Sequence, residues 1–373
     1  MNTRKTRMAA LMLVAGLSGG PNTAGAAVGV ETLTAIDLGV GQAYAINNAG
    51  QVVGKSGNTV FLTGANGVGK TNLGISSNAE IGGINDSGQV IGTYWTSGGM
   101  QHGFITGANG VGLTDLGTLG GMDSKAYDIN NAGQVTGYSS TSSNVTHAFI
   151  TGPNGVGMTD LGAIATHSLG GGINESGQVA GWGDGYAFIT GPNGSGMTYL
   201  GNLGGSAGTI GGNSWGQAIN SSGQVVGLSE TGTFTFGYPD YHAFITGSNG
   251  VGMMDLGTLG GPRSVAEDIN DLGQIIGWSQ LAGDSPLVGG KPFVTGANGS
   301  AMTNLDSLVT LTAGAYISRV ERINNFGQII AAGSDGHAYL LTTAVPEPET
   351  YAMMLAGLGL LGFAVQRRKP TKV

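Results

Sequence analysis

Seven copies of one short motif limit what this chain can fold into. The motif Ile-Asn-x-x-Gly-Gln-[Val/Ile] recurs with its asparagines 38, 45, 44, 46, 50 and 54 residues apart. These asparagines are Asn47, Asn85, Asn130, Asn174, Asn220, Asn270 and Asn324. Self-similarity at such a period indicates supersecondary units that are stacked or set in a ring.

Each unit has the pattern of four short strands. In the third unit we expect strands at 126–130, 134–139, 147–151 and 157–161. Asn-Asn-Ala-Gly at 130–133 joins the first strand to the second, and Gly-Pro-Asn-Gly at 152–155 joins the third to the fourth. Both segments carry Asn, Pro or Gly where tight turns need them. Four strands in about 45 residues is the size of a β-propeller blade.

Two further motifs show how the ends of the repeat region meet. An aromatic-x-Thr-Gly-x-Asn-Gly motif follows each Ile-Asn motif, and its seventh copy is truncated after Tyr339. The first copy of a motif close to Thr-[Asp/Asn]-Leu-Gly lies before the first unit, at 34–38. No copy follows the last strand of the last unit, which is at 338–341. A ring accounts for both ends, because strand 34–38 can complete the last sheet and remove its open edge.

The sequence therefore predicts an all-β fold. It is a seven-bladed β-propeller of four-stranded blades, closed by the N-terminal strand, over residues 31–342. A β-solenoid or paired sandwiches are the alternatives.

Composition excludes several other classes of protein. The 373 residues include 74 glycines, which is incompatible with a mostly helical chain, and the glycines lack the period of three of collagen. Hydrophobic residues make up 40%, enough to bury a core. The net charge is −8 and no basic stripe is present, so we expect no nucleic-acid partner.

The first 26 residues have the features of a secretory signal peptide. Arg4, Lys5 and Arg7 precede a short apolar segment at 8–17, and Ala-Gly-Ala at 24–26 provides a cleavage site. The apolar segment is too short to span a bilayer. Export of a chain with no cysteine means that the fold must be stable without disulfides.

The C-terminal segment has three parts in a fixed order. Pro346-Glu347-Pro348 is followed by an apolar run at 351–365 and then by Arg367 and Arg368. The run is 15 residues long, just under the usual length of a membrane-spanning helix, and we expect a transmembrane helix with the basic end in the cytoplasm. An ordinary uncut membrane tail is the alternative.

This order resembles the PEP-CTERM sorting signal of exported bacterial proteins over residues 345–369. The resemblance implies an exosortase-type partner in a Gram-negative bacterium that makes extracellular polysaccharide. It also implies an inner-membrane tail anchor during sorting, followed by location at the cell surface or in the matrix.

The repeats also resemble the HAF-type extracellular repeats of bacterial surface proteins. The His-Ala-Phe triplet stands at 147–149 and 242–244, and close variants begin at His102 and His337. Three units carry Thr59, Tyr186 or Lys291 instead of the histidine. This resemblance implies a non-catalytic surface protein and names no ligand.

In such a blade, the short uniform turns lie on one face and the variable connections on the other. We expect long loops at 93–101, 139–146, 201–217, 228–241, 278–290 and 306–319. Seven aromatic residues within them are candidate ligand-binding residues: Tyr94, Trp95, Trp215, Phe234, Phe236, Tyr238 and Tyr241. They would stack on sugars or peptides, or they cap the hydrophobic interior.

The sequence offers no clear catalytic, metal or cofactor site. Four of the five histidines occupy equivalent repeat positions, which favours a structural role over metal binding. The Asp-Ile-Asn segments at 128 and 268 lack the later ligands of a calcium loop. Residues 64–71 match the sequence pattern of a phosphate-binding loop, but the segment is a β-turn that recurs in other units, and we expect no helix after it.

These patterns favour an exported, non-catalytic surface or biofilm-matrix protein. Its propeller would bind polysaccharide or a surface protein, with no cofactor and no metal. The alternative is a propeller hydrolase or lyase acting on extracellular polysaccharide. Such an enzyme would gather acidic residues, or His167, near the channel mouth with shifted pKa values.

Overall fold

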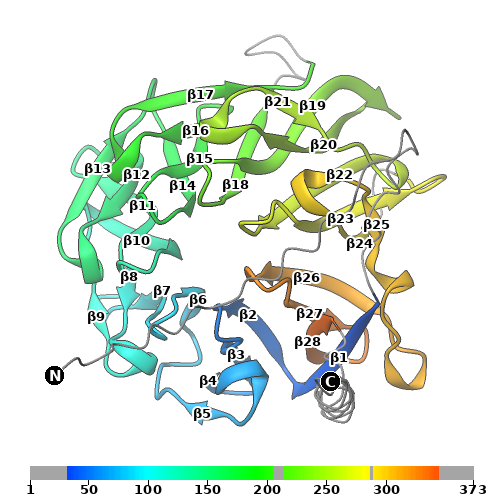
Figure 1. The fold of residues 1–373 in the computed structure, drawn as a ribbon. Coiled ribbons are helices and arrows are strands. Elements are labelled where there is room, and N and C mark those ends of the chain that lie inside the picture. The colour runs from blue at the N-terminus through cyan, green and yellow to red at the C-terminus, as the bar shows by residue number, and fades with distance from the viewer. Residues whose placement is uncertain (1–31, 205–212, 286–288, 344–373) are drawn as a thin grey trace, which may run out of the picture.

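The computed structural model describes residues 32–204, 213–285 and 289–343, and all of its sheets are built from β-strands that run largely antiparallel. The sheets are arranged radially around a common axis, like the blades of a propeller (Figure 1). The all-β prediction is therefore confirmed. The sheets do not stack in a line.

The described strands form five sheets of four strands and one of eight. The first three sheets contain β2 (Gln42–Ile46), β3 (Val52–Ser56), β4 (Thr59–Leu62) and β5 (Thr71–Asn72); β6 (Glu80–Ile84), β7 (Val90–Trp95), β8 (Gln101–Ile105) and β9 (Thr114–Asp115); and β10 (Gly120–Ile129), β11 (Val135–Thr141), β12 (Thr146–Thr151) and β13 (Met158–Gly162). The next contains β14 (Ser168–Ile173), β15 (Val179–Gly183), β16 (Tyr186–Thr190) and β17 (Met197–Gly201).

The eight-stranded sheet consists of two four-stranded units in sequence. They are β18 (Ser214–Ile219), β19 (Val225–Thr235), β20 (Tyr238–Thr246) and β21 (Met253–Asp255), then β22 (Gly260–Ile269), β23 (Ile275–Leu281), β24 (Lys291–Val294) and β25 (Thr303–Asn304). A single parallel bridge, Tyr241 to Arg263, joins the two units. Each unit otherwise has the same antiparallel order as the separate sheets.

The last sheet brings together the two ends of the described chain. It contains β26 (Ile317–Ile323), β27 (Ile329–Gly333), β28 (His337–Thr343) and, beside β28, the N-terminal strand β1 (Leu33–Val40). Ala35 pairs with Leu341 and Ile36 with Leu340. The predicted pairing of strand 34–38 with strand 338–341 is thus confirmed, and the outer edge of this sheet is supplied from the other end of the sequence (Figure 1).

The motif asparagines form a closed ring of hydrogen bonds around the axis. Each side-chain amide donates to the backbone carbonyl of the next motif asparagine, at 2.9–3.2 Å, and Asn324 closes the ring on Asn47 at 2.9 Å. Each side-chain oxygen also accepts from the backbone N–H four residues later, which shapes the turn. All seven side chains are buried. The ring therefore satisfies polar groups that would be costly to bury unpaired.

In five units the motif glutamine ties its turn to the neighbouring unit. Its side-chain amide reaches the asparagine of that unit's short 3-10 turn, as in Gln134 to Asn193 at 3.3 Å and, across the closure, Gln328 to Asn66 at 3.1 Å. Six of the described units have such a 3-10 turn. These six turns are η1 (Ala65–Gly67), η2 (Ala108–Gly110), η3 (Pro153–Gly155), η4 (Pro192–Gly194), η5 (Ser248–Gly250) and η6 (Ala297–Gly299). The last sheet is preceded by η7 (Leu305–Ser307) and η8 (Thr312–Gly314).

The motif glycine is required by a close contact between the two turns of its own unit. Gly133 has a φ of +75°, and a Cβ there would lie 2.8 Å from the backbone nitrogen of Asn154 in the adjoining 3-10 turn. A larger residue would separate the two turns. The turns therefore pack as a pair at one end of each sheet.

The hydrophobic core lies between the sheets rather than at the axis. The aromatic residue of the second motif is buried in every unit, and Phe104, Phe149, Phe188, Phe244 and Phe293 are completely covered. One cluster joins Val53 and Val60 of one sheet to Ile84 and Phe104 of the next. Adjacent sheets are therefore held by apolar packing across their faces and by the polar ring at their inner ends.

Two faces follow from this arrangement. The turn face carries the Asn-x-x-Gly turns and the 3-10 turns, and the loop face carries the other connections. The prediction of loops at 228–241 was wrong, because β19 and β20 continue to a two-residue turn, with Phe234 opposite Pro239 and Thr235 opposite Tyr238. Several predicted loop aromatics lie in strands for the same reason: Tyr94 and Trp95 in β7, Trp215 in β18 and Tyr241 in β20.

We predict that Asn174→Ala destabilises the fold by about 2 kcal/mol, because the buried Gln178 backbone N–H loses its partner and the Asn220 carbonyl keeps only the Gly223 N–H. Urea unfolding measures the loss. Asn58→Ala, at an exposed turn, is the control and should have little effect. Equal stability of the two variants would show that the ring is not needed.

Candidate functional site

The axis of the ring is a polar channel. Around its turn-face end lie the residues that directly follow the motif asparagines: Asn48, Asp86, Asn131, Glu175, Ser221, Asp271 and Asn325. Their cavity measures about 170 Å³. Backbone N–H groups donate to side-chain oxygens of the next unit, as in Asn48 to Asp86 at 2.8 Å and Asp271 to Asn325 at 2.9 Å. This end is thus already engaged in holding neighbouring units together.

Three charged side chains lie deeper in the channel. Asp128 and Asp268 each accept the N–H of their own following residue and that of an isoleucine in another unit, Ile173 at 2.9 Å and Ile323 at 2.8 Å. Burial raises the pKa of Asp128 to about 6 and also raises that of Asp268, while the positive charge of Arg322 opposes both shifts. These three side chains remain open to the channel, although protein surrounds them.

The channel opens on the loop face into a wider pocket. A cavity of about 350 Å³ is lined by Tyr44, Tyr127, Trp215, Gln217, Glu267 and Glu321, with Arg322 at its base. A second cavity of about 320 Å³ shares Glu267, Glu321 and Arg322 and adds Trp278 and Arg319. We call these two cavities the mouth pocket. It combines aromatic rings with carboxylates, the groups with which proteins usually hold polar, ring-shaped ligands.

The two mouth-pocket carboxyls are electrostatically perturbed. Burial raises the pKa of Glu267, against the attraction of Arg322, and the Trp278 side chain is hydrogen-bonded to it. Burial likewise raises the pKa of Glu321, which pairs with Arg319. Each carboxyl therefore takes up a proton more readily than a free glutamate does.

Stacked rings make the wall of the mouth pocket rigid. Trp215 stacks on Trp182 with centroids 5.2 Å apart and planes 18° apart. Tyr127 lies 5.7 Å from Tyr138. Aromatic pairs at these distances attract each other beyond simple burial. The rings are thus held in place before any ligand arrives.

The β19–β20 hairpin is a second aromatic feature of the loop face. Phe234, Phe236 and Tyr238 are exposed, Phe236 by 83% at the tip. Phe236 also has a φ of +50°, a conformation that is strained for a residue with a side chain of this size. Strain in an exposed aromatic residue is more typical of a binding position than of one kept for stability.

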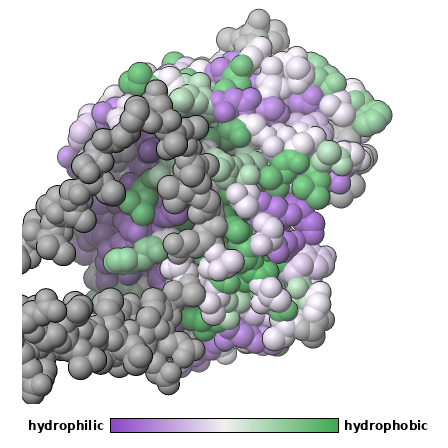
Figure 2. Space-filling view, turned by 45° about the vertical axis from the view of Figure 1, so that its right-hand side comes forward, coloured by the Kyte–Doolittle hydropathy of each residue, from purple (hydrophilic) through white to green (hydrophobic). Residues whose placement is uncertain are grey.

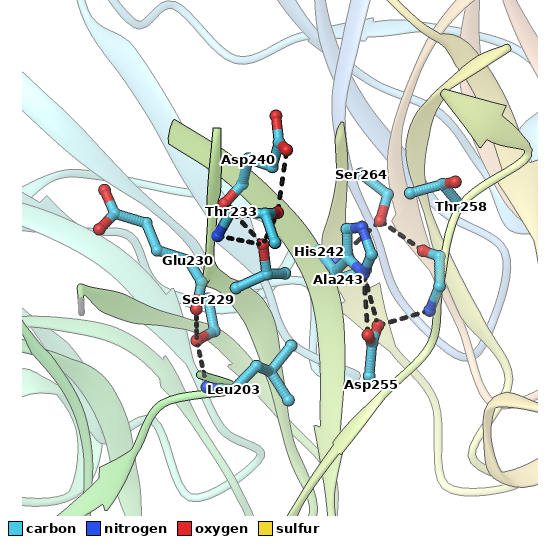
Figure 3. Close-up of polar contacts among 12 residues, drawn as sticks. Leu203, Ser229, Glu230, Thr233, Asp240, His242, Ala243, Asp255, Thr258 and Ser264 are labelled. Carbon is cyan, nitrogen blue, oxygen red and sulfur yellow. Dashed lines mark hydrogen bonds and ion pairs between the residues drawn. The ribbon is translucent and has the colours of Figure 1, made fainter. Parts of the chain in front are cut away.

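A buried carboxylate stiffens this hairpin. The Asp240 side chain accepts a hydrogen bond from the Thr233 hydroxyl at 2.9 Å (Figure 3). It also accepts one from the Thr235 hydroxyl at 3.1 Å. The Arg263 guanidinium lies over the Tyr241 ring at 5.0 Å and donates to the Pro239 carbonyl at 3.0 Å. The hairpin is therefore a rigid arm fixed to the next four-stranded unit of the same sheet.

The structure does not gather the seven predicted aromatics into one site. Trp215 lies in the mouth pocket, and Phe234, Phe236 and Tyr238 lie on the arm. Tyr241 packs edge-on against Trp278. Tyr94 packs on Phe104 and its hydroxyl bonds Asp115, whereas Trp95 at the end of β7 is exposed.

Sequence reasoning missed most of the mouth pocket. Tyr44, Tyr127, Gln217, Glu267 and Glu321 all stand three residues before a motif asparagine. They differ in type, so they do not appear as a motif. Their shared repeat position is the signal that could have found them, since a ring brings equivalent positions around one axis.

The histidines of the repeat are paired within the sheets. Nδ1 of His102, His147, His242 and His337 lies 2.8–2.9 Å from the carboxylate of Asp115, Asp160, Asp255 and Asp37, respectively. Figure 3 shows the pair of His242 and Asp255, with Ser264 of the next sheet accepting from the Ala243 N–H. The fifth, His167, has its backbone N–H bonded to Asp184. These contacts support the structural interpretation of the repeated histidines.

Comparison with known families identifies the C-terminal segment. Residues 344–369 match the family described as the PEP-CTERM protein-sorting motif. The chain therefore carries a signal for exosortase sorting, as predicted for 345–369. The predicted signal peptide at 1–26, the sorting residues Pro346, Glu347, Pro348, Arg367 and Arg368, and the predicted helix at 351–365 lie outside the described residues. Within the described ranges no helix is long and apolar enough to cross a membrane.

Solved structures resemble the fold at low sequence identity. YCF48 bound to D1 peptide is 10% identical, with a TM-score of 0.52, over 86% of this chain and 99% of that one. An extracellular domain of a one-component system of B. thetaiotaomicron is 9% identical, with a TM-score of 0.50, over 83% and 40%. The WD40 β-propeller domain of Doa1 is 12% identical, with a TM-score of 0.46, over 84% and 94%. A search of curated sequences found no significant match.

We predict that the protein gains stability on mild acidification through Asp128. Its folded pKa of about 6 exceeds the ordinary unfolded value of about 3.9, so the folded state binds more protons between these pH values and becomes relatively more stable as pH falls. Between pH 7 and pH 5 this contributes about 1 kcal/mol. Urea unfolding of Asp128→Asn should lack that gain. The same gain in both proteins would contradict the assignment.

Proposed function

We propose that this chain is an exported surface or biofilm-matrix protein whose seven-bladed propeller binds extracellular polysaccharide on its loop face. The blade count takes the eight-stranded sheet as two blades and β1 as the outer strand of the last. The sorting motif at 344–369 supports the location. The observation that carries the binding function is the mouth pocket, with its aromatic walls and paired carboxyls.

The chemistry of the mouth pocket suits a sugar. Aromatic faces such as Trp215 pack against the C–H faces of a pyranose ring, and carboxylates such as Glu267 accept hydrogen bonds from its hydroxyls. The rigid arm adds a second aromatic contact at Phe236, away from the axis. A polymer that occupies both would gain from the linked contacts.

The path of the chain presents this face outward. β28 ends beside the start of β27, with Leu341 paired to Ile329, and Ile329 directly follows an Asn-x-x-Gly turn. The described chain therefore ends on the turn face, directly before the sorting motif in the sequence. A tail anchored in the membrane leaves the loop face pointing away from it, where polysaccharide is accessible.

A polysaccharide hydrolase or lyase is the second candidate. Glu267 and Glu321 line the same two cavities, and burial raises the pKa of both, as expected of a general acid. Release of reducing ends from a polysaccharide by the purified protein, lost in Glu267→Gln, would favour this function. Retention of the protein on the polysaccharide without release of reducing ends would favour a binding function alone.

We predict that deleting residues 346–369 changes the location of the protein. Without the sorting motif it should accumulate in the periplasm or be released, and cell fractionation with surface immunodetection measures this. Deletion of 370–373, beyond the matched motif, is the control. Unchanged surface display after the larger deletion would refute sorting by the tail.

We predict that Phe236→Asn separates ligand binding from stability. Asparagine tolerates a positive φ better than phenylalanine, so the variant should be slightly more stable, by about 0.5 kcal/mol, while it loses one aromatic contact. Retention on polysaccharide columns should fall several-fold. Met254→Asn removes an exposed apolar side chain from the outer strand β21 and should bind normally. Unchanged retention of Phe236→Asn would remove the arm from the site.

A further inference from the structure

The turn face carries exposed apolar side chains at two repeated positions. Val68, Val111, Val156 and Val251 each follow an Asn-Gly pair of a 3-10 turn, and each is 73% exposed. Leu272 and Phe326 occupy the Asn-x-x-Gly turns of two other units and are also largely exposed. Six units thus each place one apolar side chain on this face, and we call these six residues the apolar rim.

The turns do not require these side chains. Ser195 and Ser300 occupy the position of the valines in the other two 3-10 turns. The backbone there is the same, with φ of −72° and ψ of 127° at Ser195 and φ of −78° and ψ of 121° at Val156. The valines contribute little to the core and serine fits the turn, so neither packing nor turn geometry requires an apolar side chain here. A single exposed valine would be ordinary, but six units place an exposed apolar side chain on the same face.

The described part of the chain ends on the same face. The last described residue, Thr343, ends β28 at the turn face, and the apolar run of the tail begins at residue 351. The intervening seven residues span at most about 25 Å when fully extended. A bilayer that holds the apolar run therefore lies within about that distance of Thr343, on the side of the propeller that carries the apolar rim.

From this geometry we propose that the apolar rim rests on the lipid bilayer in which the tail is anchored. The inference rests on the tail anchor of the proposed function. The tail holds the propeller close to the bilayer and so raises its local concentration there. Six separate apolar side chains are then enough to keep the turn face on the membrane, whereas a free domain with the same side chains would bind weakly. The rim thereby sets the orientation of the propeller and holds the mouth pocket outward.

The contact is apolar rather than electrostatic. The carboxylates of the turn face, Asp86, Glu175 and Asp271, surround the axis, and each accepts a backbone N–H from a neighbouring unit. They offer nothing to anionic headgroups. The docking should therefore persist at high salt, unlike that of a basic surface.

Site-specific fluorescence quenching tests this docking on the protein with its tail intact. The chain has no cysteine, so Ser300→Cys on the turn face and Ala282→Cys on the loop face each give one labelling site in the same four-stranded unit. The labelled proteins are reconstituted in phosphatidylethanolamine–phosphatidylglycerol vesicles that contain a lipid with a nitroxide near the headgroup.

We expect quenching at position 300 to be several-fold stronger than at position 282. Val68, Val111, Val156 and Val251 are then replaced together by serine, the residue that the chain itself uses at 195 and 300. This variant should lose the excess quenching while it still floats with the vesicles.

Two results would overturn the docking alone: equal quenching at both positions, or quenching unchanged by the serine replacements, in protein that floats with the vesicles. Failure to float would instead refute the tail anchor, and the docking with it. Circular dichroism of the serine variant establishes that it is folded.

Discussion

The fold depends on a closed ring of asparagine side chains. Each of these amides joins two neighbouring units, because it donates to the carbonyl of the next asparagine while its oxygen shapes its own turn. A ring of this kind has no end at which a donor or acceptor is left unpaired. Breaking one member exposes buried polar groups in two units, whereas a surface hydrogen bond would affect only one. The closure from Asn324 to Asn47 therefore matters as much as the pairing of β1 with β28.

The ring also decides where the chain can vary. The motif asparagines, and the motif glutamines of five units, make contacts that cross from one unit to the next, while the motif glycine packs against the 3-10 turn of its own unit. These contacts keep the turn face nearly uniform. The loop-face connections take no part in these contacts. One of them extends into the β19–β20 arm without disturbing the pairing of Ile219 with Val225 at the base of the same sheet. Ligand-binding features can thus accumulate on the loop face at little cost to the scaffold.

The sequence indicated the ring because each unit contributes the same residue to it. The spare strand at 34–38 then followed from counting strands. The arm was not predictable in the same way, since its Phe236-Gly237 turn lacks the Asn-Gly signal of a tight hairpin and its strand residues alternate irregularly. The mouth pocket was not predicted for another reason. Tyr44, Tyr127 and Glu267 occupy the same repeat position, but their side chains differ in chemistry and form no motif. Only the radial arrangement brings them together.

The charges in the channel link the scaffold to the site. Ala45, Gly83, Gly172 and Ala218 occupy the position that Asp128, Asp268 and Arg322 hold in the other units, so the ring forms equally well without charge there. Burial makes these carboxylates costly at neutral pH, as the raised pKa of Asp128 shows. Arg322 offsets part of that cost and at the same time lines the base of the mouth pocket. We infer that this set of charges is retained because Arg322, held in place by the two carboxylates, gives a site walled by aromatic rings a polar floor, which suits a ligand that is apolar on its ring faces and rich in hydroxyls at its edges.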